Sequence, residues 1–350
     1  MAGRRPNNKP QGKPPALRKV GARRRFFLSI LIGGLLLESG LRILLGNFGQ
    51  AKVLQRSDDS EICLELRPET QQVYTGWRAR VAPSQMIINS YGIRGPELEL
   101  EPADGTLRIV VLGDSFTFGQ GVNYAASYPA VLEEQLRSAG INAEVLNFGV
   151  PGHSTPQSVA LAKARVTPLK PDLVLLSVFA NDLSAAESYC HYGRGGNATS
   201  AWVLRNVYVG RLAYLLVSPF LFGEVTPPDY PSLRSPNERF VDSLNTLQAM
   251  AESEGFLAGT VLLTDRSMFL EQRFCPGCTP AHDLVGQTSI RVFDLGPTWA
   301  ELQDDIPGNF IIGEDHFTEQ GNRRIGSALT SALLKWPEFS ASAGRAGATR

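Results

Sequence analysis

Residues 109–121 read Ile-Val-Val-Leu-Gly-Asp-Ser-Phe-Thr-Phe-Gly-Gln-Gly, an apolar run that ends in a turn carrying Asp114 and Ser115. The apolar run is typical of a buried strand, and the glycine and aspartate after it are typical of a turn. Open α/β sheets place their chemistry at the carboxyl ends of their strands. The stretch therefore predicts a serine hydroxyl presented at that edge of a sheet.

Three distant segments carry polar residues of the kind that would complete such a site. They are Asn147-Phe-Gly-Val-Pro-Gly152, Phe179-Ala-Asn-Asp182 and Glu314-Asp-His-Phe-Thr318. Each segment is common by itself, but the ordered set resembles the GDSL/SGNH hydrolase superfamily. The family's serine, glycine, asparagine and histidine match Ser115, Gly152, Asn181 and His316, and the resemblance covers about residues 85–335.

The resemblance implies a three-layer αβα sandwich with a mainly parallel, flavodoxin-like sheet, and a serine esterase that works through an acyl-enzyme. Ser115 would be the nucleophile and His316 the base that takes its proton. The oxyanion hole would consist of the backbone N–H groups of Ser115 and Gly152 and the side-chain amide of Asn181. No cofactor and no metal ion are expected.

The acid behind the histidine departs from the family pattern. The family usually has an aspartate three residues before the histidine, where this chain has Gly313. Glu314 and Asp315 are the candidates. We favour Glu314, because a side chain two positions before the histidine can turn back to the imidazole more easily than one on the adjacent residue. A Ser–His dyad or a distant acid remains open. His153, beside the glycine motif, is an alternative base.

Strand and helix patterns alternate through the rest of the chain. Apolar runs predict strands at 108–112, 143–147, 173–178, 260–263 and 291–295. Helices are expected from Ser127, from Thr155, over 238–254 and over 318–334. Such alternation predicts a parallel sheet with helices on both faces.

The N-terminal segment is strongly polarised. Residues 1–25 contain nine Lys or Arg and no acid, and residues 26–45 are mostly apolar. Twenty helical residues span about 30 Å, the thickness of the hydrocarbon core of a bilayer. We expect a single-pass transmembrane signal-anchor in the cell membrane, with the catalytic domain extracytoplasmic by the positive-inside rule. A cleaved signal peptide is the alternative.

The charges outside that segment do not favour nucleic acid as a partner. The whole chain of 350 residues has 34 basic and 34 acidic side chains, but residues 46–350 have 24 basic and 33 acidic ones. The basic character is thus local to the N-terminus. The expected partners are the membrane, through residues 26–45, and an acylated substrate.

These patterns predict the following organisation of the chain: a basic disordered tail (1–25), a membrane anchor (26–45), a connector (46–84), a hydrolase domain (85–338) with an insertion at 183–236, and a disordered tail (339–350). The insertion is unusually long for one connection between two elements.

The four cysteines fit an exported domain. Cys275 and Cys278 are close in a segment rich in Pro and Gly, whereas Cys63 and Cys190 are isolated. A structural disulfide is the default interpretation, and free thiols or metal and redox chemistry are the alternatives.

The sequence therefore favours a membrane-anchored serine esterase that acts on an O-acyl ester of a small molecule, a lipid or an envelope glycan. Two alternatives remain open. One is an O-acyltransferase that uses the same serine and histidine with a sugar hydroxyl in place of water. The other is a non-catalytic envelope scaffold that kept the fold.

Overall fold

The computed structural model describes residues 17–45, 53–74, 83–179, 182, 236–263, 283–295, 305–311 and 316–348. The strands are β1 (Leu54–Arg56), β2 (Leu64–Leu66), β3 (Gln71–Tyr74), β4 (Ser84–Ile87), β5 (Leu107–Gly113), β6 (Ala143–Gly149), β7 (Leu173–Val178), β8 (Leu257–Leu262) and β9 (Arg291–Asp294). The helices are α1 (Leu17–Leu45), α3 (Ser115–Phe118), α4 (Tyr128–Ser138), α5 (Thr155–Arg165), α9 (Pro236–Glu254), α13 (Ile306–Asn309), α14 (Glu319–Leu334) and α15 (Pro337–Ala348), with short 3₁₀ turns at Tyr124–Ala126 and Thr167–Leu169.

Five strands form the central sheet in the order β6-β5-β7-β8-β9, and every neighbouring pair is parallel. The chain passes from β5 to one neighbour, β6, and then crosses back to the other, β7. The carboxyl end of β5 is therefore the topological switch point, where open α/β sheets bind their ligands.

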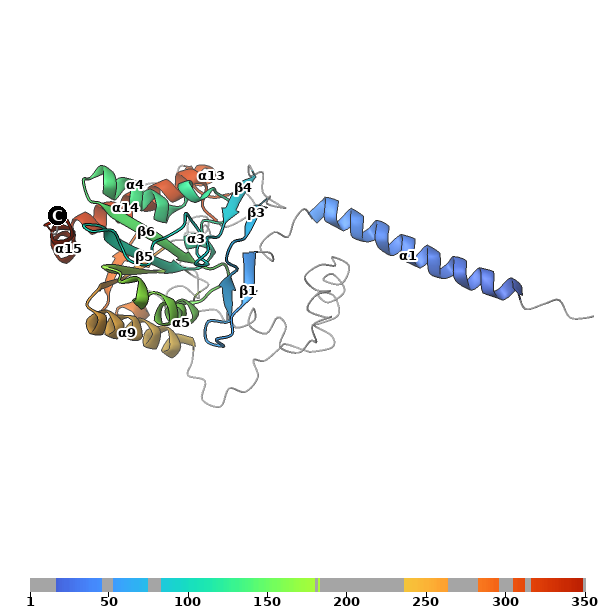
Figure 1. The fold of residues 1–350 in the computed structure, drawn as a ribbon, viewed down its shortest axis with the longest axis horizontal. Helices are drawn as coiled ribbons and strands as arrows, with labels where there is room; N and C mark the ends of the chain where they lie inside the picture. Colours follow the sequence, from blue (N-terminus) through green and yellow to red (C-terminus); the bar gives the residue numbers. More distant parts are fainter. Residues whose placement is uncertain are drawn as a thin grey trace, which may run out of the picture.

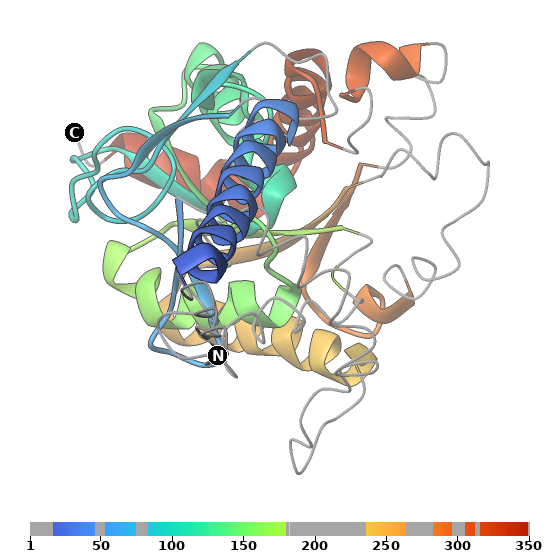
Figure 2. The same cartoon turned by 90° about the vertical axis from the view of Figure 1, so that its right-hand side faces the viewer.

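Helices cover both faces of the sheet (Figures 1 and 2). Helices α5 and α9 pack on one face and α4, α14 and α15 on the other, each group with its own hydrophobic cluster. Strand β5 is buried throughout and sends alternate side chains to the two clusters: Val110 and Leu112 to the first, Ile109 and Val111 to the second. The predicted parallel sheet between two helical layers is confirmed.

Most predicted strands and helices are shifted by a few residues at one or both ends in the structure, and two differences are larger. Strand β8 begins at Leu257, before the expected residue 260. The tail expected over 339–350 is wrong over most of its length, because α15 runs from Pro337 to Ala348. Phe339 is 0% exposed and packs in the cluster of α4 and α14, so tertiary burial orders a segment whose many small residues give little local signal.

Helix α1 begins at Leu17, so residues 17–25 of the expected disordered tail are helical. The structure does not confirm the predicted transmembrane helix at 26–45. Nowhere in the described ranges is a helix both long and apolar enough to cross a membrane. Cations occupy the first turns of α1, and Glu38 interrupts its apolar stretch.

Strands β1 and β2 form one antiparallel ribbon and β3 and β4 form another, and both pack against the domain (Figure 1). Cys63, between β1 and β2, is bonded in a disulfide. The other three cysteines and the predicted insertion, apart from its last residue, lie outside the described residues.

Candidate active site

Ser115 is the first residue of α3, a single helical turn that follows β5 without a linker. Asp114 is the N-cap, and its Oδ1 accepts a hydrogen bond from the backbone N–H of Phe116 at 2.9 Å. Ser115 therefore stands at a helix N-terminus, where backbone N–H groups have no carbonyl partner within the helix. Such N–H groups can stabilise a developing negative charge.

Two glycines let this helix sit close to the sheet. Gly113 has a φ of +154°, and a Cβ there would collide with the Thr117 hydroxyl. A Cβ at Gly149, at the end of β6, would collide with the backbone of Phe118. Since Gly113 and Gly149 are paired in register, α3 lies across the ends of β5 and β6.

His316 lies beside the Ser115 hydroxyl although 201 residues separate them. The distance from His316 Nε2 to Ser115 Oγ is 2.8 Å, within the range needed for proton transfer. The backbone around His316 is fixed on both sides: Ile311 N–H donates to its carbonyl at 2.8 Å, and Thr318 caps α14. The structure thus brings the expected nucleophile and base together.

An aromatic cluster packs against the histidine through Phe116. The Phe116 ring is 4.9 Å from the His316 ring and stacks on Phe179 at 3.7 Å, measured between centroids. Phe317 contacts the edge of Phe116 at 5.1 Å. Because Phe116 follows Ser115 and Phe317 follows His316, one apolar cluster packs the two segments together.

Gly152 lies in the turn after β6 with a φ of +86°, a conformation that favours glycine. Val150 N–H donates to the Gly113 carbonyl at 2.9 Å, so this turn runs beside the one that carries Ser115. Asn181 lies outside the described residues, between Phe179 and Asp182.

Asp182 links two of these turns. It is buried, and it accepts hydrogen bonds from Phe179 N–H at 2.6 Å and from Thr155 Oγ1 at 3.0 Å. Burial and, secondarily, the nearby Asp114 raise the pKa of Asp182 to about 8. These hydrogen bonds give Asp114 a capping role and Asp182 a turn-holding role.

The structure argues against His153 as the base. This side chain is 1% exposed, and its Nε2 is 2.7 Å from the Leu64 carbonyl. Burial lowers the pKa of His153 to about 4, so the ring stays neutral at physiological pH. The two candidate acids, Glu314 and Asp315, lie outside the described residues together with Gly313.

Buried polar side chains that the sequence analysis did not single out support the site. The Tyr128 hydroxyl is 2.8 Å from Thr117 Oγ1 and also contacts Ser177 Oγ, which joins α3, α4 and β7. Asn322 accepts from Tyr128 N–H at 3.0 Å and donates to the Thr318 carbonyl at 3.0 Å. The role of these side chains is visible only from their contacts in the folded chain, because nothing in the local sequence distinguishes them from other polar residues of helices and strands.

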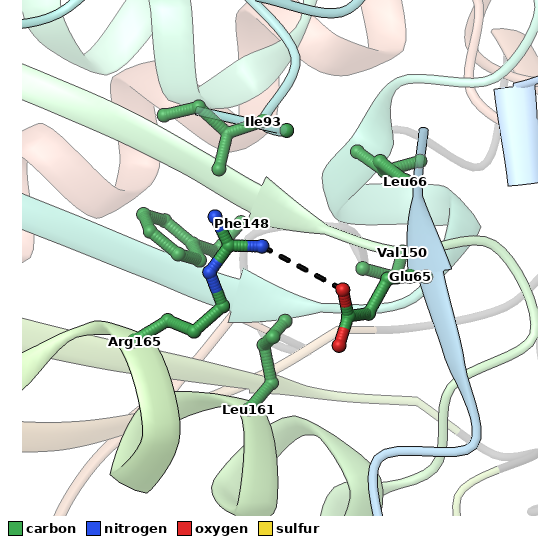
Figure 3. Close-up of a pocket in the computed structure, with 8 residues that line it drawn as sticks. Glu65, Leu66, Ile93, Phe148, Val150, Leu161 and Arg165 are labelled. Atoms are coloured by element: carbon green, nitrogen blue, oxygen red, sulfur yellow. Dashed lines mark ion pairs between the residues drawn. The ribbon is translucent and has the colours of Figure 1, made fainter. Parts of the chain in front are cut away.

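A small cavity lies away from this site, against α5 (Figure 3). Arg165 and Glu65 face each other across it with an N–O distance of 3.7 Å, and Phe148, Ile93 and Leu161 line it. None of the described catalytic candidates lines it. We therefore treat it as a packing gap between β2, α5 and the loop after β4.

Two comparisons of the sequence with known proteins give partial matches. The sequence profile of the GDSL-like Lipase/Acylhydrolase family matches residues 111–252. An arylesterase of Vibrio mimicus is 32% identical over 75 residues, which are 21% of this chain and 38% of that protein. The chain thus matches less than half the length of this relative.

The fold resembles solved structures at low sequence identity. A lipase/acylhydrolase from Enterococcus faecalis has a TM-score of 0.42 and 16% identity, over 65% of this chain and 95% of that one. A member of the lipolytic protein G-D-S-L family from Veillonella parvula DSM 2008 has a TM-score of 0.40 and 15% identity, over 66% and 100%.

Proposed function

We propose that this chain hydrolyses an O-acyl ester through an acyl-enzyme on Ser115. The match to the GDSL-like Lipase/Acylhydrolase family supports the proposal, because members of that family are serine hydrolases that cleave esters. The observation that carries this proposal is the 2.8 Å contact between Ser115 Oγ and His316 Nε2 at the switch point of the sheet. A small-molecule, lipid or glycan ester would be the substrate.

In this mechanism Ser115 Oγ attacks the acyl carbon while His316 Nε2 takes the hydroxyl proton. The carbonyl oxygen becomes an oxyanion, which the N–H groups of Ser115 and Gly152 and the amide of Asn181 stabilise. His316 then gives the proton to the departing alkoxide. In the second half, water attacks the acyl-enzyme with His316 as base, and the acid and free Ser115 are released.

A fluorophosphonate probe tests the nucleophile directly. The Ser115 oxygen should displace fluoride and form one phosphonyl ester per chain, identified by mass spectrometry on the peptide that contains residue 115. A pre-incubation with p-nitrophenyl acetate should slow the labelling, because the acetyl-enzyme occupies the same oxygen. A chain that folds but takes up no probe would contradict the proposed activity and favour a scaffold.

We further propose that residues 26–45 hold the domain at the extracytoplasmic face of the cell membrane. Large apolar side chains cover the described part of this stretch, and those from Phe26 to Leu37 are between 48% and 68% exposed. Contiguous exposed apolar surface of this kind is typical of contact with lipid or with another protein. The nine cations that precede it favour a cytoplasmic N-terminus.

Membrane extraction and a topology reporter test this location. The full chain should stay with the membranes at alkaline pH, and a chain lacking residues 1–45 should be released. A phosphatase fused after Arg350 should be active only outside the cytoplasm. Removal of residues 2–25 alone should keep membrane attachment but reduce the active fraction. Release of the full chain at alkaline pH, or an inactive but stable fusion, would contradict the proposed location.

A further inference from the structure

Arg94 is a buried cation that contacts the end of the nucleophile helix. Its side chain is 1% exposed. Nη1 donates to the carbonyls of Phe118 and Gly119, both at 2.6 Å, and Nη2 donates to the carbonyl of Val122 at 2.6 Å. The guanidinium also lies over the Phe118 ring, 4.6 Å from its centroid.

This arrangement is unusual for a buried charge. Among the described residues, the hydrogen bonds of Arg94 all go to backbone carbonyls, including that of Gln85 at 3.0 Å, and none goes to a carboxylate. Burial lowers the pKa of Arg94 to about 10, which reflects the free-energy cost of removing this cation from water. The planar guanidinium places several N–H donors in a fixed geometry, which a shorter or neutral side chain cannot do.

Helix α3 needs such donors because it is a single turn. One turn of helix is unstable by itself, and its last carbonyls have no partner within the helix. Arg94 binds the carbonyl of Phe118, the last residue of α3, and that of the C-cap Gly119, and Asn147 Nδ2 binds that of Thr117 at 2.8 Å. The same turn begins at Ser115, whose carbonyl accepts from Gly119 N–H at 3.1 Å. A single backbone hydrogen bond thus links Ser115 to Gly119, whose carbonyl Arg94 binds.

The segment that carries Arg94 is itself fixed to the domain. Asn89 closes it as a turn, with its Oδ1 accepting from Ile93 N–H at 3.1 Å. Arg94 pairs with Asn147 of the edge strand β6 in an isolated antiparallel bridge. The Tyr91 hydroxyl donates to the Arg165 carbonyl at 2.7 Å, and the Arg165 guanidinium lies beside the same loop (Figure 3). Arg94 therefore connects this hydrogen-bonded loop to the end of α3.

We propose that Arg94 is a positioning residue for catalysis: by binding the carbonyl end of α3 it keeps Ser115 Oγ within hydrogen-bond reach of His316. This inference rests on the proposed esterase function. It assigns a role to the Asn89–Gly95 segment, which pairs with the edge strand β6 and whose arginine reaches the nucleophile helix.

The chain offers a matched control in Arg108, at the other end of β5. Arg108 is 0% exposed and donates to the carbonyls of Glu99, Leu100 and Leu169 between 2.7 and 2.9 Å. It differs from Arg94 in pairing with Glu144 and in lying away from Ser115. Arg94→Lys and Arg108→Lys both keep the charge and lose the planar fork. Their comparison separates a general loss of buried hydrogen bonds from a loss at the site.

Arg94→Lys should lower kcat for p-nitrophenyl acetate by about 10- to 100-fold, since small misplacements of reacting groups have effects of this size. KM should stay within about twofold of the wild type, because the substrate itself does not contact Arg94. The fluorophosphonate labelling rate should fall in parallel with kcat. Arg108→Lys should keep kcat within about threefold at a similar loss of melting temperature.

Hydrogen exchange gives a readout that does not depend on activity. Arg94→Lys should lose amide protection selectively in residues 114–122, and Arg108→Lys should not. Equal exchange and equal kcat in the two variants would overturn the proposal. Unfolding of both Arg94→Lys and Arg94→Gln would also overturn it, because Arg94 would then be a requirement of the whole fold. A wild type that lacks esterase activity would refute the proposed function, while the exchange data would still decide whether Arg94 holds α3.

Discussion

Ser115→Ala is expected to lower the turnover of p-nitrophenyl acetate by about 10⁴-fold or more and to abolish fluorophosphonate labelling. The reason is chemical: the substitution removes the only atom that could form the acyl-enzyme, while His316 and the backbone of the turn remain. The melting temperature should hardly change, because Ser115 is half-buried and loses a single side-chain hydrogen bond, to His316.

A suitable control is Ser243→Ala. Ser243 is also half-buried, and its Oγ donates one hydrogen bond, to the Arg239 carbonyl at 2.7 Å, but it lies on α9. This variant should match Ser115→Ala in stability and the wild type in turnover. Retention of more than a tenth of the wild-type turnover by Ser115→Ala would reject Ser115 as the nucleophile.

The second large effect concerns the acid behind His316. Glu314→Gln is expected to lower kcat by ~10²–10⁴-fold, because it keeps the side-chain shape but removes the charge that would orient the ring and stabilise the imidazolium. Asp315→Asn should have a much smaller effect. Steady-state kinetics on p-nitrophenyl acetate, with circular dichroism to verify folding, measures both.

Glu319→Gln controls for the loss of a nearby negative charge, since Glu319 is exposed in the first turn of α14. Gly313→Asp restores the family's usual spacing and should recover part of the activity of Glu314→Gln. An inactive Asp315→Asn beside a near-normal Glu314→Gln would reverse the assignment. Mild effects in both would indicate a dyad or an acid from elsewhere in the chain.

Several features of the fold could be read from the sequence because they depend on local patterns. Strand β7 spans the predicted residues 173–178, since an uninterrupted apolar run between turn signals fits only a strand buried on both faces. Helix α14 ends at Leu334 as expected, and its Thr318 cap is visible as a residue type. The ordered motifs, through their resemblance to the GDSL/SGNH family, predicted that Ser115 and His316 lie together, and their side chains are 2.8 Å apart.

Other features depend on contacts between distant segments and leave no local trace. Nothing in the local sequence shows what Arg94 contacts, yet its bridge to Asn147 places it against the end of α3. Phe339 lies among small residues that suggest a frayed end, yet the cluster around α14 buries it completely. Cys63 forms a disulfide that its isolated position did not reveal.

The sequence by itself determined the parallel α/β sheet, because periodicity is a property of short segments, and its ordered motifs predicted Ser115 and His316 as nucleophile and base through their resemblance to the GDSL/SGNH family. Only the tertiary structure decided how α3 is held, that His153 is buried and neutral, and that the C-terminal segment is a helix. Those outcomes depend on which surfaces the folded chain brings together, since burial and hydrogen-bond partners are defined only when distant residues meet.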